Sequence, residues 1–144
     1  MEFIGNTPIA KIRYKYKGKS NYIYAKLEYY NLTGSIKDRM ANYIIEKAIK
    51  RGELKPKQAI IEATSGNTGI AISAIGAKLG HPVYIFMPDW VSKERVNIMK
   101  NYGAHVKLYS ASEGWFKRCI KESKILAKRI NGFCTNQFSN KDWL

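Results

Sequence analysis

The sequence predicts an α/β protein with three layers, in which a mainly parallel sheet is connected by crossover helices. Two observations predict this class. Short runs rich in β-branched and aromatic residues alternate strictly with longer segments whose apolar residues recur at helical spacing. The connections between these segments are short, which is typical of parallel strands joined by helices. The length of 144 residues fits one ordinary domain.

The elements follow one another in a regular order along the chain. The first strand covers residues 22–27. The helix after it starts at Ser35, where Asp38 completes a capping-box pattern, and it ends at Gly52. Glycine or proline residues bound most of the later elements. We expect further strands at residues 59–63, 83–87, 105–109 and 133–135, and further helices at residues 67–79, 93–102 and 113–130.

The charge is strongly basic, with 25 basic and 11 acidic residues and a formal net charge of +14. Residues 11–19 interleave basic side chains with tyrosines and resemble a nucleic-acid surface. The other lysines are scattered over the predicted helices, and lysine outnumbers arginine by 19 to 6, whereas base and phosphate recognition favours arginine. We therefore expect a solvated cationic surface that attracts small anions, with nucleic-acid binding as a remote alternative.

Metal-binding and membrane classes find no support in the sequence. Cys119, Cys134 and the two histidines lack the spacing of metal ligands, so we expect no metal site and small buried thiols. The apolar run at residues 83–87 is stopped by Pro88, far short of a membrane span. Residues 1–6 lack the features of an export signal. We expect a cytoplasmic protein with no membrane segment.

A polar turn, Thr64-Ser65-Gly66-Asn67-Thr68-Gly69, follows the strand at residues 59–63. Ligands of α/β sheets bind beyond the carboxyl ends of strands, where this turn is expected to lie. Its glycines allow close approach, and the first N–H groups of the next helix are available donors. The turn suits a carboxylate or another small oxyanion, and it matches neither a phosphate loop nor a dinucleotide loop. The alternative is an ordinary turn whose polar residues cap the helix.

Two further residues are candidates for the same site. Lys37 falls in the first turn of its predicted helix, where the partial positive charge favours a neutral amine of the kind that Schiff-base chemistry needs. The alternative is a lysine that points to solvent. Gln137 follows the last predicted strand and would lie on the same rim as the Thr64 turn. Taken alone, it is part of a polar loop.

In this order, these segments resemble the cysteine synthase family of fold-type II pyridoxal-phosphate enzymes, which contains O-acetylserine sulfhydrylase and cystathionine β-synthase. The resemblance extends from residue 4 to about residue 140. The matching motifs are Ile4-Gly5-Asn6-Thr7-Pro8, residues 31–39, residues 50–56, residues 64–69, Met87-Pro88, residues 92–95, residues 102–104 and residues 136–140.

The resemblance implies a role for each candidate. Lys37 would hold pyridoxal 5'-phosphate covalently and later move the α-proton of the substrate, and Asn67 would donate to the ring oxygen of the cofactor. The α-carboxylate of the substrate would be bound by Thr64, Ser65, Gly66, Thr68 and Gln137. The implied chemistry is pyridoxal-phosphate-dependent β-elimination and β-replacement on a serine-derived amino acid.

The substrate stays open within this family. The motif Ser-Gly-Asn-Thr-Gly favours the cysteine synthase branch over threonine synthases and dehydratases. Asp89-Trp90 departs from that branch, in which a glutamate commonly follows the proline. The choices are O-acetylserine with sulfide, serine or cysteine with a thiol, and cysteine lysis.

The resemblance also implies a division of the chain. Residues 1–33 would belong with a larger domain, and residues 34–144 would form the small domain that carries the carboxylate loop. The second glycine-rich loop, which binds the cofactor phosphate in the family, is not found in these residues. We expect residues 22–27 to have an open edge and an uncovered apolar face, and hence a homodimer or association with a complementary C-terminal half. Alone, the chain is expected to show little or no turnover. The alternatives are a catalytically inactive truncated remnant and a binding module of the same fold.

Overall fold

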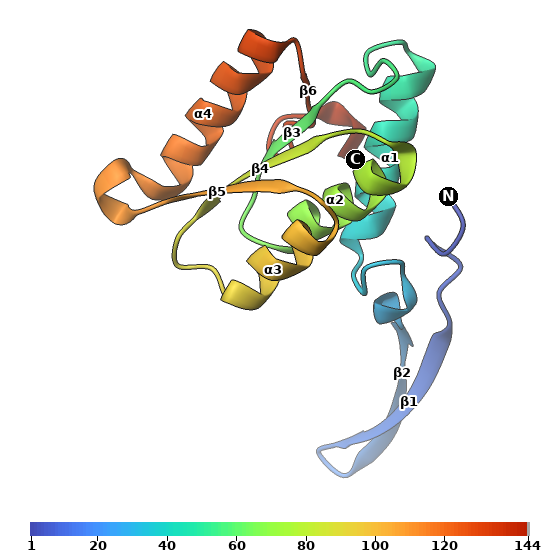
Figure 1. The fold of residues 1–144 in the computed structure, drawn as a ribbon. Helices are drawn as coiled ribbons and strands as arrows, with labels where there is room; N and C mark the ends of the chain where they lie inside the picture. The colour runs from blue at the N-terminus through green and yellow to red at the C-terminus, as the bar shows by residue number, and fades with distance from the viewer. Residues whose placement is uncertain (144) are drawn as a thin grey trace.

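Two sheets and four α-helices make up residues 1–143, which the computed structural model describes (Figure 1). The strands β1 (Ile9–Tyr16) and β2 (Lys19–Lys26) form an antiparallel hairpin that projects from the rest of the molecule. The second sheet is parallel, with the strand order β5-β4-β3-β6. Its strands are β3 (Ile60–Ala63), β4 (Val83–Pro88), β5 (His105–Tyr109) and β6 (Phe133–Cys134).

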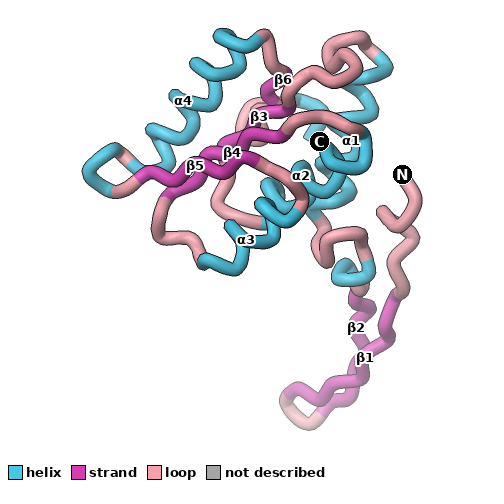
Figure 2. Tube along the Cα trace, viewed as in Figure 1, coloured by secondary structure: helices cyan, strands magenta, loops and turns pink. Residues whose placement is uncertain are grey.

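Helices on both faces of the parallel sheet confirm the predicted α/β class and its three layers (Figure 2). On one face, Ile45 and Ile75 pack with Ile60 in the larger core cluster. On the other face, Cys119 of α4 packs with Ile61. The helices are α1 (Lys37–Lys50), α2 (Asn67–Leu79), α3 (Lys93–Asn101) and α4 (Trp115–Ile130), and the short 3-10 helices are Glu28–Tyr30, Ala111–Glu113 and Lys141–Trp143. The first three helices cover one face and α4 covers the other.

Two expectations about local structure are wrong. The segment before residue 35 contains two strands rather than one. The residues predicted to form a basic patch, 11–19, make up much of β1 and the start of β2. The capping box at the start of α1 does not form. Asp38 instead accepts hydrogen bonds from the backbone N–H of Thr33, at 2.7 Å, and from the Thr33 hydroxyl. The carboxylate therefore closes the turn before the helix, while the Ser35 hydroxyl accepts from the Lys37 N–H at 3.2 Å.

The β1–β2 hairpin has two chemically different faces. Its register places Ile12 opposite Ile23 on one face and Lys11 opposite Tyr24 on the other, because side chains alternate along a strand. The first face comprises Ala10, Ile12, Tyr14, Tyr16, Ile23 and Ala25 with two polar residues near the turn. Ile12 and Ile23 are 44% and 50% exposed. The hairpin thus presents the uncovered apolar face that the sequence predicts for residues 22–27.

A hydrogen-bonded ion pair joins the N-terminal segment to α1. Arg39 donates from Nε and Nη2 to the two carboxylate oxygens of Glu28, at 2.7 and 2.9 Å. Thr7 and Asn31 also donate to this carboxylate, at 2.7 and 2.8 Å. The hydrogen bonds from Arg39 and the other donors lower the pKa of Glu28 to about 2. Thr7 and Asn31, which both lie in motifs of the resemblance, have structural roles here.

Among residues 1–143, no helix combines the length and the apolar character needed to cross a membrane. The same residues contain no group of three or more His, Cys, Asp or Glu side chains arranged to hold a metal ion. Cys119 and Cys134 are both free thiols, the first buried and the second half-buried.

Candidate active site

A cavity of about 300 Å³ lies where the turn after β3, the start of α1 and the segment after β6 meet. It brings together residues from four separate parts of the chain, because the first turn of α3 also reaches it. All seven residues predicted from the sequence line this cavity: Lys37, Thr64, Ser65, Gly66, Asn67, Thr68 and Gln137. The turn and Gln137 share a rim because β3 and β6 are parallel neighbours whose carboxyl ends lie at the same edge of the sheet.

The turn after β3 is held by short-range hydrogen bonds. The Thr64 N–H donates to the carbonyl of Phe86, at 3.0 Å, so the ladder with β4 continues into the turn. The Thr64 hydroxyl then accepts from the Gly66 N–H, at 3.2 Å. A Cβ atom on Gly66 would lie only 3.3 Å from Nη1 of Arg95. Glycine therefore allows the guanidinium to lie against the turn, where it donates to the Ser65 carbonyl at 3.3 Å.

Gln137 is fixed to the end of β3 through both its backbone and its side chain. Its N–H donates to Oε2 of Glu62, at 3.0 Å, and its Nε2 donates to the carbonyl of Ala63, at 2.7 Å. Glu62 is only 2% exposed, and the Thr135 hydroxyl donates to the same carboxylate oxygen. Burial raises the pKa of Glu62, while these donated hydrogen bonds oppose the shift. A buried carboxyl group thus anchors the loop that carries Gln137.

Lys37 is the first residue of α1 and is half-buried. Its side chain lines the cavity together with Asn67, the first residue of α2, and with Gln137. Lys37 therefore lies at the same cavity as the predicted turn, and its role stays a prediction. The N-termini of two helices meet at the cavity, and the unsatisfied N–H groups of a helix N-terminus favour an anion.

Sequence reasoning missed two lining residues, Arg95 and Phe138. Arg95 lies in the first turn of α3, which follows β4, and this placement on the rim could be inferred from the strand order. The direction of its long side chain could not. Phe138 is 65% exposed, and its ring packs edge-on against Phe116 of α4, with ring centroids 5.3 Å apart. Its position depends on the contact with α4, for which the local sequence gives no signal.

The lining residues, all in the described part of the chain, include two basic side chains and no carboxylate. Hydroxyl groups, backbone N–H groups and an arginine suit a carboxylate ligand. A primary amine and an amide side chain in the same cavity also fit the ring end of pyridoxal phosphate, because an amine can condense with its aldehyde and an amide can donate to the adjacent oxygen.

The fold is that of a pyridoxal-phosphate enzyme, and the comparisons with known proteins identify the family. The family model described as "Pyridoxal-phosphate dependent enzyme" matches residues 1–143, so the chain belongs to that family. A cysteine synthase of Staphylococcus aureus is 42% identical over 139 residues, which are 96% of this chain and 44% of that protein.

Solved structures agree with this assignment. A hydrogen sulfide-producing enzyme from Fusobacterium nucleatum superposes with a TM-score of 0.91 at 50% identity, over 96% of this chain and 42% of that one. Cysteine synthase from Entamoeba histolytica gives a TM-score of 0.86 at 42% identity, over 98% of this chain and 43% of that one. The chain therefore spans less than half the length of the relatives that it matches.

Proposed function

We propose that this chain forms the substrate-carboxylate side of the active site of a pyridoxal-phosphate-dependent enzyme of the cysteine synthase type. The reaction would be β-elimination and β-replacement on a serine-derived amino acid. The observation that supports this most directly is the single cavity shared by Lys37, Asn67, the Thr64–Thr68 turn and Gln137. These residues come from different elements, so their convergence is a property of the fold and not of one local motif.

Each of these residues has a definite task in the proposed reaction. Lys37 would hold the cofactor and then carry the proton taken from the substrate Cα, and Asn67 would orient the cofactor ring. Bound there, pyridoxal phosphate supplies an electron sink for the carbanion at Cα. The Thr64–Thr68 turn would bind the substrate carboxylate, assisted by Gln137. We add Arg95 as a cation that strengthens the hold on this carboxylate, because its guanidinium lies against the same turn.

The proposal also covers the location and the partners of the protein. We propose a cytoplasmic protein, in keeping with two free thiols. We propose that a second copy or a complementary C-terminal half covers the apolar face of the hairpin. The exposure of Ile12 and Ile23 supports such an association, because monomers rarely leave a contiguous apolar patch of this kind uncovered.

Selective attachment of the cofactor tests the proposal. The chain is incubated with pyridoxal phosphate, treated with borohydride to trap any lysine conjugate, digested and mapped by mass spectrometry. We expect the conjugate to concentrate on Lys37 among the 19 lysines. Lys37→Ala should abolish this conjugate, whereas Lys100→Ala, which removes an exposed lysine of α3, should leave it unchanged.

A second measurement separates this proposal from the binding-module alternative. Addition of O-acetylserine should shift the amide NMR signals of residues 64–68, and sulfide should then yield cysteine only when the rest of the active site is supplied. Shifts at residues 64–68 without a conjugate on Lys37 would favour a binding module. Labelling spread evenly over surface lysines, with no shifts at the turn, would contradict the proposed function.

A further inference from the structure

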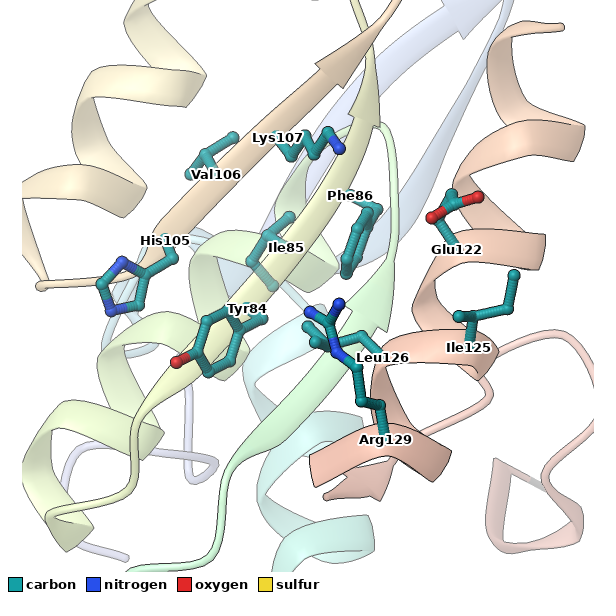
Figure 3. A pocket seen from close by; sticks show the side chains of 10 residues that line it. All are labelled: Tyr84, Ile85, Phe86, His105, Val106, Lys107, Glu122, Ile125, Leu126 and Arg129. Carbon is teal, nitrogen blue, oxygen red and sulfur yellow. The ribbon is translucent and has the colours of Figure 1, made fainter. Parts of the chain in front are cut away.

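A second cavity of about 330 Å³ lies between α4 and the strands β4 and β5 of the parallel sheet (Figure 3). The register pairs Tyr84 with His105 and Phe86 with Lys107, so these four side chains lie on the face of the sheet that carries α4. The helix packs on β3 and β4 and covers the edge strand β5 at Tyr109, while His105 and Lys107 of β5 stay exposed on this face. This groove shares no lining residue with the candidate active site.

The floor and one wall of the groove are apolar and largely aromatic. The Phe86 side chain is buried, and Leu126 of α4 packs against the same cluster. The rings of Tyr84 and His105 are stacked, with centroids 4.8 Å apart and an angle of 20° between their planes. A flat apolar group can therefore lie against rings on the sheet side and against aliphatic side chains on the helix side.

Cations stand on both sides of this apolar slot. Lys107 projects from β5 and Arg129 projects from the last turn of α4 (Figure 3). The amine of Lys107 lies 5.1 Å from the centre of the Tyr109 ring, so it stays close to the sheet face. The carboxylate in the lining, Glu122, is paired with Arg118 at 2.9 Å. The groove therefore carries a net positive charge in a molecule whose overall charge is already +14.

We propose that this groove binds a small aromatic carboxylate. The ring would lie against Tyr84 on the sheet side and against Ile125 and Leu126 on the helix side, and the carboxylate would be bound by Lys107 and Arg129. A volume of about 330 Å³ is enough for a single-ring acid and falls at the lower end of the range for small-molecule sites. The proposal is independent of the chemistry proposed for the cavity at Lys37.

The test uses 3-phenylpropionate as the probe and 3-phenylpropanol as its uncharged counterpart, each titrated into the full chain and followed by amide NMR shifts. We expect the acid to bind about tenfold more tightly than the alcohol, because charge-assisted bonds to Lys107 and Arg129 are available only to the acid. The shifts should fall on β4, β5 and α4. Arg129→Gln and Lys107→Gln should each weaken binding of the acid several-fold and leave binding of the alcohol unchanged.

Lys128→Gln is the matched control, because it removes the same charge from the neighbouring exposed position of α4, outside the groove lining. Equal affinities for the acid and the alcohol would overturn the proposal. So would shifts centred on residues 64–68, which would place the carboxylate in the other cavity. If Arg129→Gln and Lys128→Gln weakened binding of the acid equally, net charge alone would explain the effect. That result would also overturn the proposal.

Discussion

The buried carboxyl group of Glu62 is expected to control the loop that carries Gln137, and Glu62→Gln tests this. The substitution keeps size and shape but replaces one acceptor oxygen by an NH₂ group. In the wild type, three donors meet the two carboxylate oxygens: the Ala63 N–H at 2.7 Å on Oε1, and the Gln137 N–H at 3.0 Å and the Thr135 hydroxyl on Oε2. An amide cannot accept on both sides, so at least one buried donor loses its partner.

The cost of this loss can be estimated. One unsatisfied buried donor costs about 1–3 kcal/mol, which corresponds to roughly a 5- to 150-fold change in the unfolding equilibrium constant. Urea unfolding should detect a loss of this size, and hydrogen exchange should locate it, because the amide of Gln137 is expected to exchange faster in the variant. Glu53→Gln is the control, since Glu53 is exposed and lies in the turn after α1.

The pH dependence gives a second readout on the same carboxyl group. Burial raises its pKa above the ordinary value of 4.5, so its contribution to stability is complete below that value and is lost as the pH rises through the raised pKa. The stability difference between wild type and Glu62→Gln should therefore narrow with rising pH. A variant as stable as Glu53→Gln at every pH, with unchanged exchange at Gln137, would refute the reasoning.

Two further predictions concern the start of α1 and the start of α2. The pKa of Glu28 is about 2, so its ion pair with Arg39 should stabilise the fold fully above pH 4.5 and be lost as the pH falls toward 2. The melting-temperature gap between wild type and Glu28→Gln should shrink over that interval, and a constant gap would contradict this. Gly69→Ala should destabilise the protein by about 1 kcal/mol. The new Cβ would lie 2.6 Å from Thr64 Cγ2 and 2.9 Å from Met99 Cε. Overpacking of this kind costs about 1–3 kcal/mol, which exceeds the gain of about 1 kcal/mol in helix propensity. Urea unfolding measures it, and a more stable variant would contradict the clash.

Much of the fold could be predicted because its local signals agree with its tertiary structure. The helix expected at residues 67–79 has those bounds in the structure, and the strands around it are bounded by proline or by polar turns. β1 was not predicted because Lys11, Arg13 and Lys15 are typical of a charged surface patch, although they alternate with apolar neighbours at the period of a strand. The basic and the apolar residues alternate within β1, so in the structure they lie on opposite faces of the hairpin.

The part of the site that depends only on strand topology could be predicted from the sequence. Parallel strands bring the Thr64 turn and Gln137 to one rim, so their meeting follows from the order of elements alone. The buried partner Glu62 and the guanidinium of Arg95 could not be predicted in this way. Their roles depend on which way a side chain turns, and that is decided by contacts with residues distant in the sequence, such as Thr135.

The N-terminal segment contributes to the position of Lys37 even though no residue before it lines the cavity. Arg39 is two residues after Lys37 on the first turn of α1, and its side chain is held by Glu28 and Thr7. Because a helix is rigid over one turn, fixing Arg39 also fixes the direction in which Lys37 leaves the helix. These contacts cross the division predicted at residue 33, which stays a prediction. If residues 1–33 move relative to the rest of the chain, the ion pair between Glu28 and Arg39 either persists or breaks. If it persists, α1 moves together with the N-terminal segment that contains Glu28.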